Sequence, residues 1–263
     1  LEKTEIDEGD KAVLIGSFTD PGIDDTFTID VDWGDGRVKS YLLADVGSFV
    51  GTIGSFRIEH EIEDDNPTGT PSDNLRIKVT LRDDDTGSDE DTLDLKVNNV
   101  APEFEAIKLE ANPSTEGDAV LLKVDFKDKG KKDTFTIEVD WGDGSDRETF
   151  ALEAVGQFDA ATGKGSFELA HRYEDDEAPG EDDKYSVKIK LIDDDTGEVQ
   201  DTKQQQVDNA DPEVDGLEYT EEIDENGTVL LSFYVKDAGV KDDVEVQIDW
   251  GDNRANSKVK LDI

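Results

Sequence analysis

Apolar and polar residues alternate one by one along several short stretches of the chain. Within residues 27–33, Phe, Ile, Val and Trp occupy every second position, with Thr and Asp between them. Residues 75–81 alternate Leu, Ile, Val and Leu with Arg, Lys and Thr in the same way. A period of two residues is typical of a strand with one buried and one solvated face. Because no long stretch has the helical period, the pattern predicts an all-β chain.

The strand pattern belongs to a sequence that repeats about every 110 residues. The segment FTIDVDWGDG begins at Phe27, FTIEVDWGDG begins at Phe135, and VEVQIDWGDN begins at Val244. A period of this length suits a string of independent domains rather than a solenoid. We therefore expect three units, which occupy residues 1–101, 102–211 and 212–263.

The third unit contains counterparts of only the first half of the other two. The segment DDDTG occurs at 83–87 and 193–197, but it has no counterpart after residue 212. Half of a β-sandwich would leave sheet edges and apolar faces uncovered. We therefore expect that the third unit is cut short in this sequence, as a piece of a longer precursor, or is completed by another chain.

Each complete unit is predicted to be a small β-sandwich. About seven short strands separated by Gly, Asp, Asn and Pro clusters are typical of a Greek-key sandwich. One Trp recurs in each unit, on the third predicted strand: Trp33, Trp141 and Trp250. We expect these side chains to lie in the cores, where no disulfide accompanies them because the chain has no Cys.

The charge of the chain restricts its partners. The sequence has 69 Asp and Glu against 27 Lys and Arg, a formal net charge of −42. Like charges repel, so nucleic acid and anionic membranes are excluded as natural partners. No apolar run approaches the roughly 18 residues of a membrane span. The acidity instead indicates a chain that binds cations, a chain adapted to high salt, or both.

Five motifs together carry a family resemblance. A D-x-G-x-x-D loop precedes the D-W-G-D-G turn, and H-x-[IY]-x-D-D, D-D-D-T-G and N-N-V-A-P follow it. This combination resembles the PKD (polycystic kidney disease) domain over the first two repeats and the first half of the third. The resemblance implies tandem immunoglobulin-like sandwiches, found mainly in extracellular and surface-layer proteins and beside secreted hydrolase domains.

Catalysis is not expected in this chain. A nucleophile would need a His beside it, and the two His residues, His60 and His171, occupy equivalent places in successive repeats. Residues that recur with the repeat are more readily explained by structure, whereas a catalytic constellation normally occurs once. Paired carboxylates, which could hydrolyse glycosides, recur with the repeat as well.

Calcium binding is the chemistry that the acidic residues favour, because calcium takes six to eight hard oxygen ligands. We call the end of each sandwich at which its chain leaves for the next repeat the lower end, and the opposite end the upper end. Loops at the lower end of repeat one are expected to face loops at the upper end of repeat two across the linker. The predicted ligands are Asp35, Asp64, Asp65, Asn98, Asn99, Asp128, Asp133, Asp193, Asp194 and Asp195. Lys129, Lys131 and Lys132 count against a second, equal site in repeat two. The competing explanation is a solvated acidic surface adapted to salty water.

The expected function is that of non-catalytic spacer repeats in a large extracellular or cell-surface protein, such as a filament, a surface layer or an adhesin stalk. Its partners would be neighbouring repeats or subunits of the same surface assembly. The alternative is a polymer- or carbohydrate-binding accessory module of a secreted hydrolase. That role needs a row of exposed aromatic residues, for which Tyr41, Phe150 and Tyr219 are the best candidates.

Overall fold

The computed structural model describes residues 1–65, 69–176 and 183–261, and it confirms an all-β chain. Repeat one folds as two sheets packed face to face. The larger sheet has the strand order β1-β8-β7-β3-β4, and the smaller one has the order β2-β6-β5. The elements of repeat one are β1 (Glu5–Asp7), β2 (Lys11–Thr19), β3 (Phe27–Asp32), β4 (Val38–Leu42), α1 (Leu43–Val46), β5 (Gly47–Val50), β6 (Ile53–Glu61), β7 (Ser72–Asp83) and β8 (Ser88–Asn98).

Repeat two has the same architecture with one further edge strand, β9. Its sheets have the orders β10-β17-β16-β12-β13 and β14-β15-β11-β9. This is the immunoglobulin-type arrangement, in which strands A, B, E and D form one sheet and C, F and G form the other. Its elements are β9 (Glu103–Glu110), β10 (Ser114–Thr115), β11 (Ala119–Lys127), β12 (Phe135–Asp140), β13 (Glu148–Ala151), α2 (Leu152–Val155), β14 (Gly156–Asp159), β15 (Lys164–Arg172), β16 (Asp183–Asp193) and β17 (Glu198–Asp208).

Each sandwich buries one Trp in its core, as the sequence predicts. Trp33 and Trp141 are both 0% exposed. Each indole stacks on the His of its own repeat, with ring centroids 4.7 Å apart for His60 and 4.5 Å apart for His171. The recurring His residues therefore lie against the core.

The D-W-G-D-G segment forms a tight turn that follows β3 and β12. Gly34 and Gly142 adopt φ values of 79° and 83°, which disfavour any residue with a Cβ. The Asp two positions earlier accepts a hydrogen bond from each glycine amide, at 3.1 Å for Asp32 and 3.0 Å for Asp140. These two acids therefore hold the turn.

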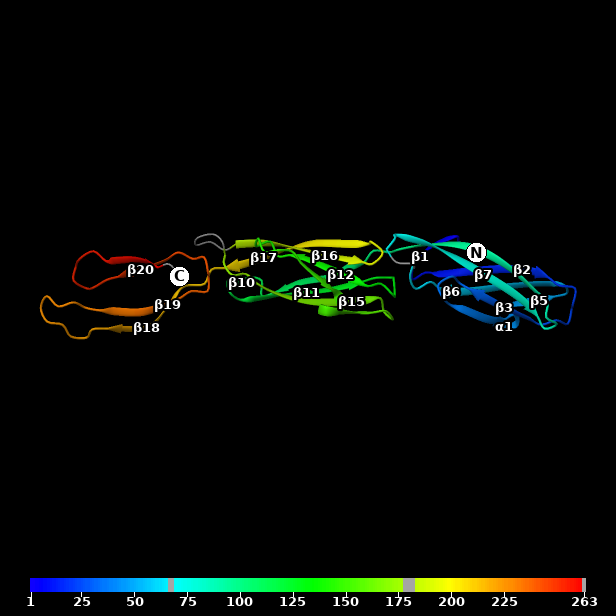
Figure 1. Ribbon diagram of the computed structural model, residues 1–263, viewed down its shortest axis with the longest axis horizontal. Coiled ribbons are helices and arrows are strands. Elements are labelled where there is room, and N and C mark those ends of the chain that lie inside the picture. Colours follow the sequence, from blue (N-terminus) through cyan, green and yellow to red (C-terminus); the bar gives the residue numbers. More distant parts are fainter. Residues whose placement is uncertain (66–68, 177–182, 262–263) are drawn as a thin grey trace.

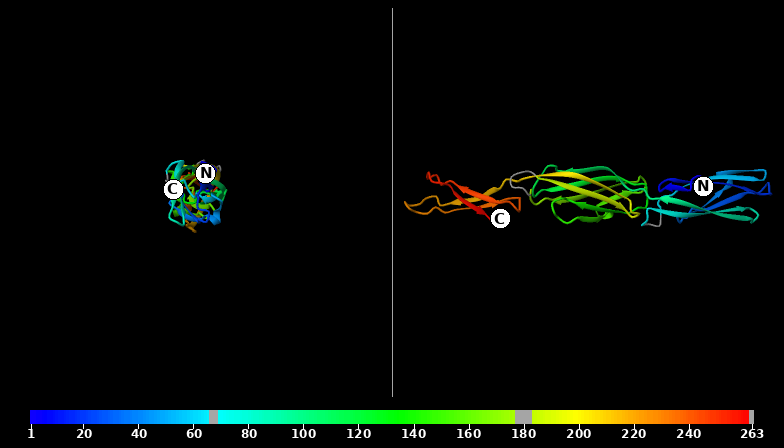
Figure 2. Two further views of the ribbon diagram at one scale, coloured as in Figure 1. Left: turned by 90° about the vertical axis from the view of Figure 1, so that its right-hand side faces the viewer. Right: turned by 90° about the horizontal axis from the view of Figure 1, so that it is seen from above.

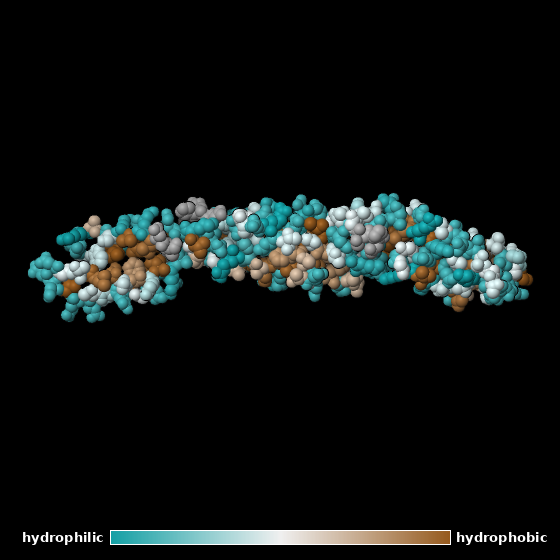
Figure 3. Space-filling model, in the orientation of Figure 1, coloured by the Kyte–Doolittle hydropathy of each residue, from teal (hydrophilic) through white to brown (hydrophobic). Residues whose placement is uncertain are grey.

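The third unit is an incomplete sandwich. It consists of two separate hairpins, β18 (Glu213–Tyr219) with β19 (Leu231–Lys236), and β20 (Val244–Ile248) with β21 (Ser257–Leu261). The prediction that Trp250 lies in a core is wrong, because its side chain is 44% exposed. The described part of this unit has no counterparts of β6, β7 and β8 to cover it. Apolar side chains consequently gather on its surface (Figure 3).

The three units lie end to end and form a rod (Figures 1 and 2). The lower end of repeat one, where β6 ends and β8 leads into the linker, meets the upper end of repeat two. Backbone contacts cross this junction, since the amide of Lys131 donates a 2.8 Å hydrogen bond to the carbonyl of Glu63. Among the described residues, no helix is long and apolar enough to cross a membrane.

Candidate metal centre

Six acidic side chains gather where repeats one and two meet. Three come from the lower end of repeat one and three from the upper end of repeat two. All six are at most 8% exposed. They are Glu8, Asp64, Asp65, Asp128, Asp133 and Asp195, which we call the junction cluster.

Glu8 enters the cluster from the turn after β1. Its Oε1 accepts a 2.7 Å hydrogen bond from the amide of Val100 in the linker. The side chain is 0% exposed, and Oε2 accepts no hydrogen bond from any described donor. One oxygen thus fixes the linker, and the other remains available to a cation.

Asp64 and Asp65 lie in the segment after β6, within the H-x-I-x-D-D motif. Asp65 is 0% exposed, and neither of its oxygens accepts a hydrogen bond from a donor in the described chain. A buried carboxylate with neither donors nor a cation is strongly disfavoured, because burial removes its hydration. The ionised form of Asp65 is therefore disfavoured unless a proton or a cation neutralises it.

Repeat two contributes Asp128 and Asp133 from the β11–β12 loop and Asp195 from the β16–β17 turn. The amide of Gly130 donates to Asp128 Oδ1 at 2.9 Å, which shapes the loop around the D-x-G-x-x-D motif. The amide of Gly69 in repeat one donates to Asp195 Oδ1 across the junction. Among the described residues, no donor reaches either oxygen of Asp133, Asp128 Oδ2 or Asp195 Oδ2.

The carboxylate oxygens come close enough together to share cations. They form three groups, in each of which the oxygens lie within 4.8 Å of one another: Glu8 with Asp128 and Asp133, Glu8 with Asp64 and Asp65, and Asp64 with Asp133 and Asp195. Two ligands of one calcium ion, each at 2.3–2.6 Å, lie at most about 5 Å apart. Every pair of groups shares one residue, so a carboxylate could bridge neighbouring ions.

The same crowding disfavours the ionised state when no metal is bound. Burial raises the pKa of Glu8 to about 8 and that of Asp128 to about 7. The pKa of Asp133 is raised to about 9 by burial and by the charges of Glu8, Asp128 and Asp64. Burial also raises the pKa of Asp65, and the neighbouring charge of Asp195 adds to the effect.

Two lysines of the β11–β12 loop form ion pairs with repeat one outside the cluster, whereas the positive charge of Lys132 acts on Asp64 and opposes the rise in its pKa. Lys129 Nζ lies 3.2 Å from Asp10 Oδ1, and Lys131 Nζ lies 2.7 Å from Glu61 Oε1. These ion pairs link repeat two to repeat one at the edge of the junction. They leave most of the negative charge inside the cluster uncompensated.

The structure separates the ten predicted ligands into three sets. Five lie in the junction cluster: Asp64, Asp65, Asp128, Asp133 and Asp195. Two others, Asn99 and Asp193, border the cluster and contact each other, since Asn99 Nδ2 donates to Asp193 Oδ2 at 3.1 Å. Asn99 Oδ1 is buried and accepts no hydrogen bond from a described donor. Asp193 Oδ1 is occupied by the amides of Asp195 and Gly197, so this residue shapes the turn.

The remaining three predicted ligands lie outside the groups of the junction cluster. Asp35 Oδ2 lies 2.7 Å from His60 Nε2, so this carboxylate pairs with the imidazole that stacks on Trp33. Asn98 Nδ2 donates to Glu5 Oε1 at 3.2 Å. Asp194 Oδ1 accepts a 2.7 Å hydrogen bond from the amide of Thr134, next to Asp133.

Glu8 is absent from the predicted ligand set, although it belongs to two of the three groups. Nothing in its local sequence separates it from the other acidic residues in turns. Its recurrence as Glu116, in the same G-D turn of repeat two, is the signal that could have identified it.

No protein-family model matches the chain, and neither does any curated protein. Among solved structures it is similar to red sea bream transglutaminase (11% identity, TM-score 0.33), covering 78% of this chain and 30% of that one. It is also similar to latent PorU from Porphyromonas gingivalis (14%, 0.30), covering 98% and 27%. A third is the FN1–FN3 region of chicken CNTN1 (10%, 0.24), covering 94% and 83%. The chain thus spans less than a third of the first two proteins.

Proposed function

We propose that this chain is a set of non-catalytic spacer repeats from an extracellular or cell-surface protein, and that calcium holds repeats one and two in line. The observation that carries the proposal is the junction cluster, whose buried carboxylates come from both repeats. Five of them have at least one oxygen that accepts no hydrogen bond from a described donor: Glu8, Asp65, Asp128, Asp133 and Asp195. The sequence resemblance to PKD domains supports a location outside the cell.

Calcium fits the ligand set better than other common metals. The groups offer only oxygen, and the chain has no Cys. Its two His residues pair with Asp35 and Asp143 instead. Structural zinc sites are built from Cys and His, and magnesium demands a near-ideal octahedron with several waters. Calcium tolerates irregular sites with six to eight oxygens, which crowded carboxylates, Asn99 Oδ1 and backbone carbonyls could supply.

The junction cluster would take more than one calcium ion. Its six carboxylates carry six negative charges when ionised, and a single divalent ion would leave four of them uncompensated. Three overlapping groups of ligands offer places for up to three ions, which would balance the charge. Glu8, Asp64 and Asp133 each belong to two groups and would act as bridges.

Bound calcium would fix the angle between the repeats, because each group that includes a repeat-two carboxylate also includes one from repeat one. Without metal, the same carboxylates repel one another across the junction. An ion that binds only the aligned state stabilises that state by RT ln(1 + [Ca]/Kd), about 2.7 kcal/mol at a concentration of 100 Kd. The repeats would thus form a stiff rod where calcium is plentiful.

Melting temperatures at fixed, high ionic strength test this proposal. Millimolar calcium should raise the melting temperature of the metal-free chain, and sodium chloride of equal ionic strength should not. Asp133→Asn should abolish most of the calcium-dependent rise, because Asp133 belongs to two groups. The matched control is Asp125→Asn, an equal charge change on the exposed face of β11. Equal effects of calcium and sodium would overturn the proposal and leave the solvated acidic surface as the explanation.

The structure offers little to favour the alternative of a carbohydrate-binding module. Of the three aromatic candidates, Tyr41 and Phe150 are partly buried and pack against the two cores. Tyr219 is 62% exposed but lies in the incomplete third unit. These three side chains therefore form no common binding row.

A further inference from the structure

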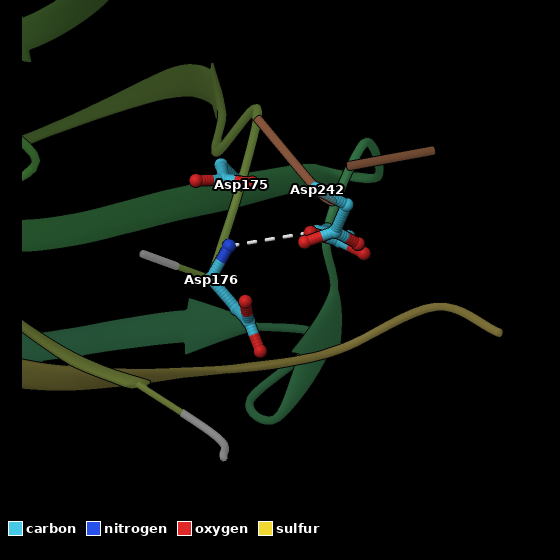
Figure 4. A group of neighbouring side chains, drawn as sticks. Asp175, Asp176 and Asp242 are labelled. Atoms are coloured by element: carbon cyan, nitrogen blue, oxygen red, sulfur yellow. Dashed lines mark hydrogen bonds between the residues drawn. The ribbon is translucent and has the colours of Figure 1, made fainter. Parts of the chain in front are cut away.

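A second group of carboxylates lies at the junction between repeat two and the third unit. Glu116 follows β10, Asp175 and Asp176 follow β15, and Asp242 lies in the loop between β19 and β20. One oxygen from each of the four lies within 4.8 Å of the others. Figure 4 shows Asp242 of the third unit beside Asp175 and Asp176 of repeat two.

The three members from repeat two are buried, and two of them have an oxygen without a described donor. Glu116 accepts hydrogen bonds from the amides of Ala210, at 2.8 Å, and Asp176, at 3.2 Å. Asp176 is 1% exposed and Asp175 is 7% exposed. Asp176 Oδ2 and Asp175 Oδ1 accept no hydrogen bond from any described donor. Burial without donors disfavours the ionised form of these carboxylates, and a bound cation would stabilise that form.

The backbone framework of the two junctions is the same. At the first, the amide of Lys131 donates to the carbonyl of Glu63 at 2.8 Å; at the second, the amide of Val240 donates to the carbonyl of Glu174 at 3.2 Å. The D-x-G-x-x-D loop that begins at Asp128 recurs at Asp237. Glu116 contacts its linker amide as Glu8 does. The third unit therefore docks on repeat two as repeat two docks on repeat one.

The cationic side chains of the described residues do not neutralise this group. Lys241 Nζ lies 3.9 Å from Asp175 Oδ2, and its side chain is 63% exposed. One solvated ammonium leaves three of the four negative charges uncompensated. Asp237, in the same loop as Asp242, adds further negative charge.

From these observations we infer that Glu116, Asp175, Asp176 and Asp242 form a second site for a divalent hard cation of the calcium class, which locks the third unit onto repeat two. The inference rests on the proposed function and extends it to the second junction. No counterpart of Asp195 lies in the described part of the third unit, so this site has fewer ligands than the first. It should therefore bind calcium more weakly.

Calcium titration of the metal-free, full-length chain, followed by native mass spectrometry and calorimetry, tests the inference. The wild type should bind calcium in a tight class and a weaker class. Asp242→Asn should weaken the second class at least tenfold and leave the tight class intact. The control Asp243→Asn changes the neighbouring residue, whose side chain is 93% exposed, and should bind like the wild type.

Two further variants keep the result decisive. Asp176→Asn alters the same site from repeat two, so it should reproduce the loss even if Asp242→Asn disturbs the third unit. Asp133→Asn alters only the first junction and should remove tight binding while the weaker class remains. Wild-type binding by both Asp242→Asn and Asp176→Asn would overturn the second site. Wild-type binding by Asp133→Asn, with the weaker class lost in the other two variants, would overturn the first site and leave the second.

Discussion

Glu8 combines two roles in one side chain at the first junction. Its Oε1 satisfies the amide of Val100, which orders the linker, and its Oε2 faces the junction cluster without a described donor. A glutamate is long enough to reach both from a turn at the edge of the sandwich. Ordering of the linker and binding of the proposed cation are therefore coupled through this residue.

The raised pKa values of the cluster predict how the metal-free chain responds to pH. The folded-state pKa values of Glu8, Asp128 and Asp133 lie at about 8, 7 and 9, above their ordinary values, mainly because of burial. The folded state therefore holds more protons than the unfolded state between about pH 5 and pH 9, so stability falls as pH rises through this window. We expect the melting temperature in EDTA to fall by about 5 °C or more over that range.

Calcium should remove this loss, because the metal binds the deprotonated ligands and its affinity rises with pH. The measurement is a series of thermal melts in EDTA and in millimolar calcium at constant ionic strength. A melting temperature in EDTA that is flat or rises from pH 5 to pH 9 would show that these carboxylates are not buried together in solution.

The sequence identified half of the predicted ligands as neighbours and misplaced others for local reasons. Asp64, Asp65, Asp128, Asp133 and Asp195 could be found because clustered acids recur at predictable ends of a sandwich. Asp35 lies at a similar place in the sequence pattern, but His60 holds its carboxylate. Whether such an acid joins the junction cluster or pairs with a His depends here on a side-chain contact between residues 25 positions apart. The repeat pattern alone does not encode that contact.

At the scale of elements, one turn motif occurs in three different packing environments. The D-W-G-D segment follows β3, β12 and β20 with a similar turn, and Asp249 accepts a 2.9 Å hydrogen bond from Gly251 as its counterparts do. Trp33 and Trp141 are fully buried, whereas Trp250 is 44% exposed. The local turn thus forms from local sequence, and burial of the Trp depends on strands that come later in the chain.

This difference predicts unequal costs for the same substitution. Trp141→Ala should destabilise repeat two by about 3–5 kcal/mol, because it removes a fully buried aromatic side chain. Trp250→Ala should cost less than about 1 kcal/mol, because nearly half of that side chain is already solvated. Urea unfolding followed by NMR signals assigned to each unit measures both values. Equal costs would contradict the packing of the third unit seen here.

The fold class and the strand pattern of the first two repeats could be predicted because alternation of apolar residues reports burial directly. Residues 27–33 form β3 and its turn, and 75–81 fall within β7, as expected. The third unit shows the limit of this inference. Its alternating residues meet too few partner strands in the described chain, so Val229 and Trp250 remain exposed and Leu231, Phe233 and Val235 are only half-buried.

At the scale of the whole molecule, the chain is a rod whose joints hold concentrated negative charge. The units contact one another mainly through loops at their ends (Figure 1). With a net charge of −42, the units repel one another unless cations intervene. The stiffness of the rod should therefore depend on its joints.

Distance measurements between labelled cysteines test this dependence without background, because the chain has no Cys of its own. Ala44, on α1, and Ala154, on α2, are both exposed and lie on either side of the first junction. Spin labels at Ala44→Cys and Ala154→Cys should give a narrow distance distribution in calcium and a broader one in EDTA. Adding Asp133→Asn should keep the distribution broad in both conditions. Identical narrow distributions throughout would mean that the linker alone sets the angle.

Each repeat carries one half of a joint at either end. The lower end of repeat one supplies Glu8, Asp64 and Asp65, and that of repeat two supplies the equivalent Glu116, Asp175 and Asp176. The upper end of repeat one carries another group, Asp20, Asp25 and Asp83, in the loops that correspond to the repeat-two half of the cluster. Duplication, deletion or reordering of whole repeats would again place the carboxylates of one lower end beside those of one upper end. No new ligand residue would be needed. The length of an array built in this way could change by recombination, while the chemistry of its joints stayed the same.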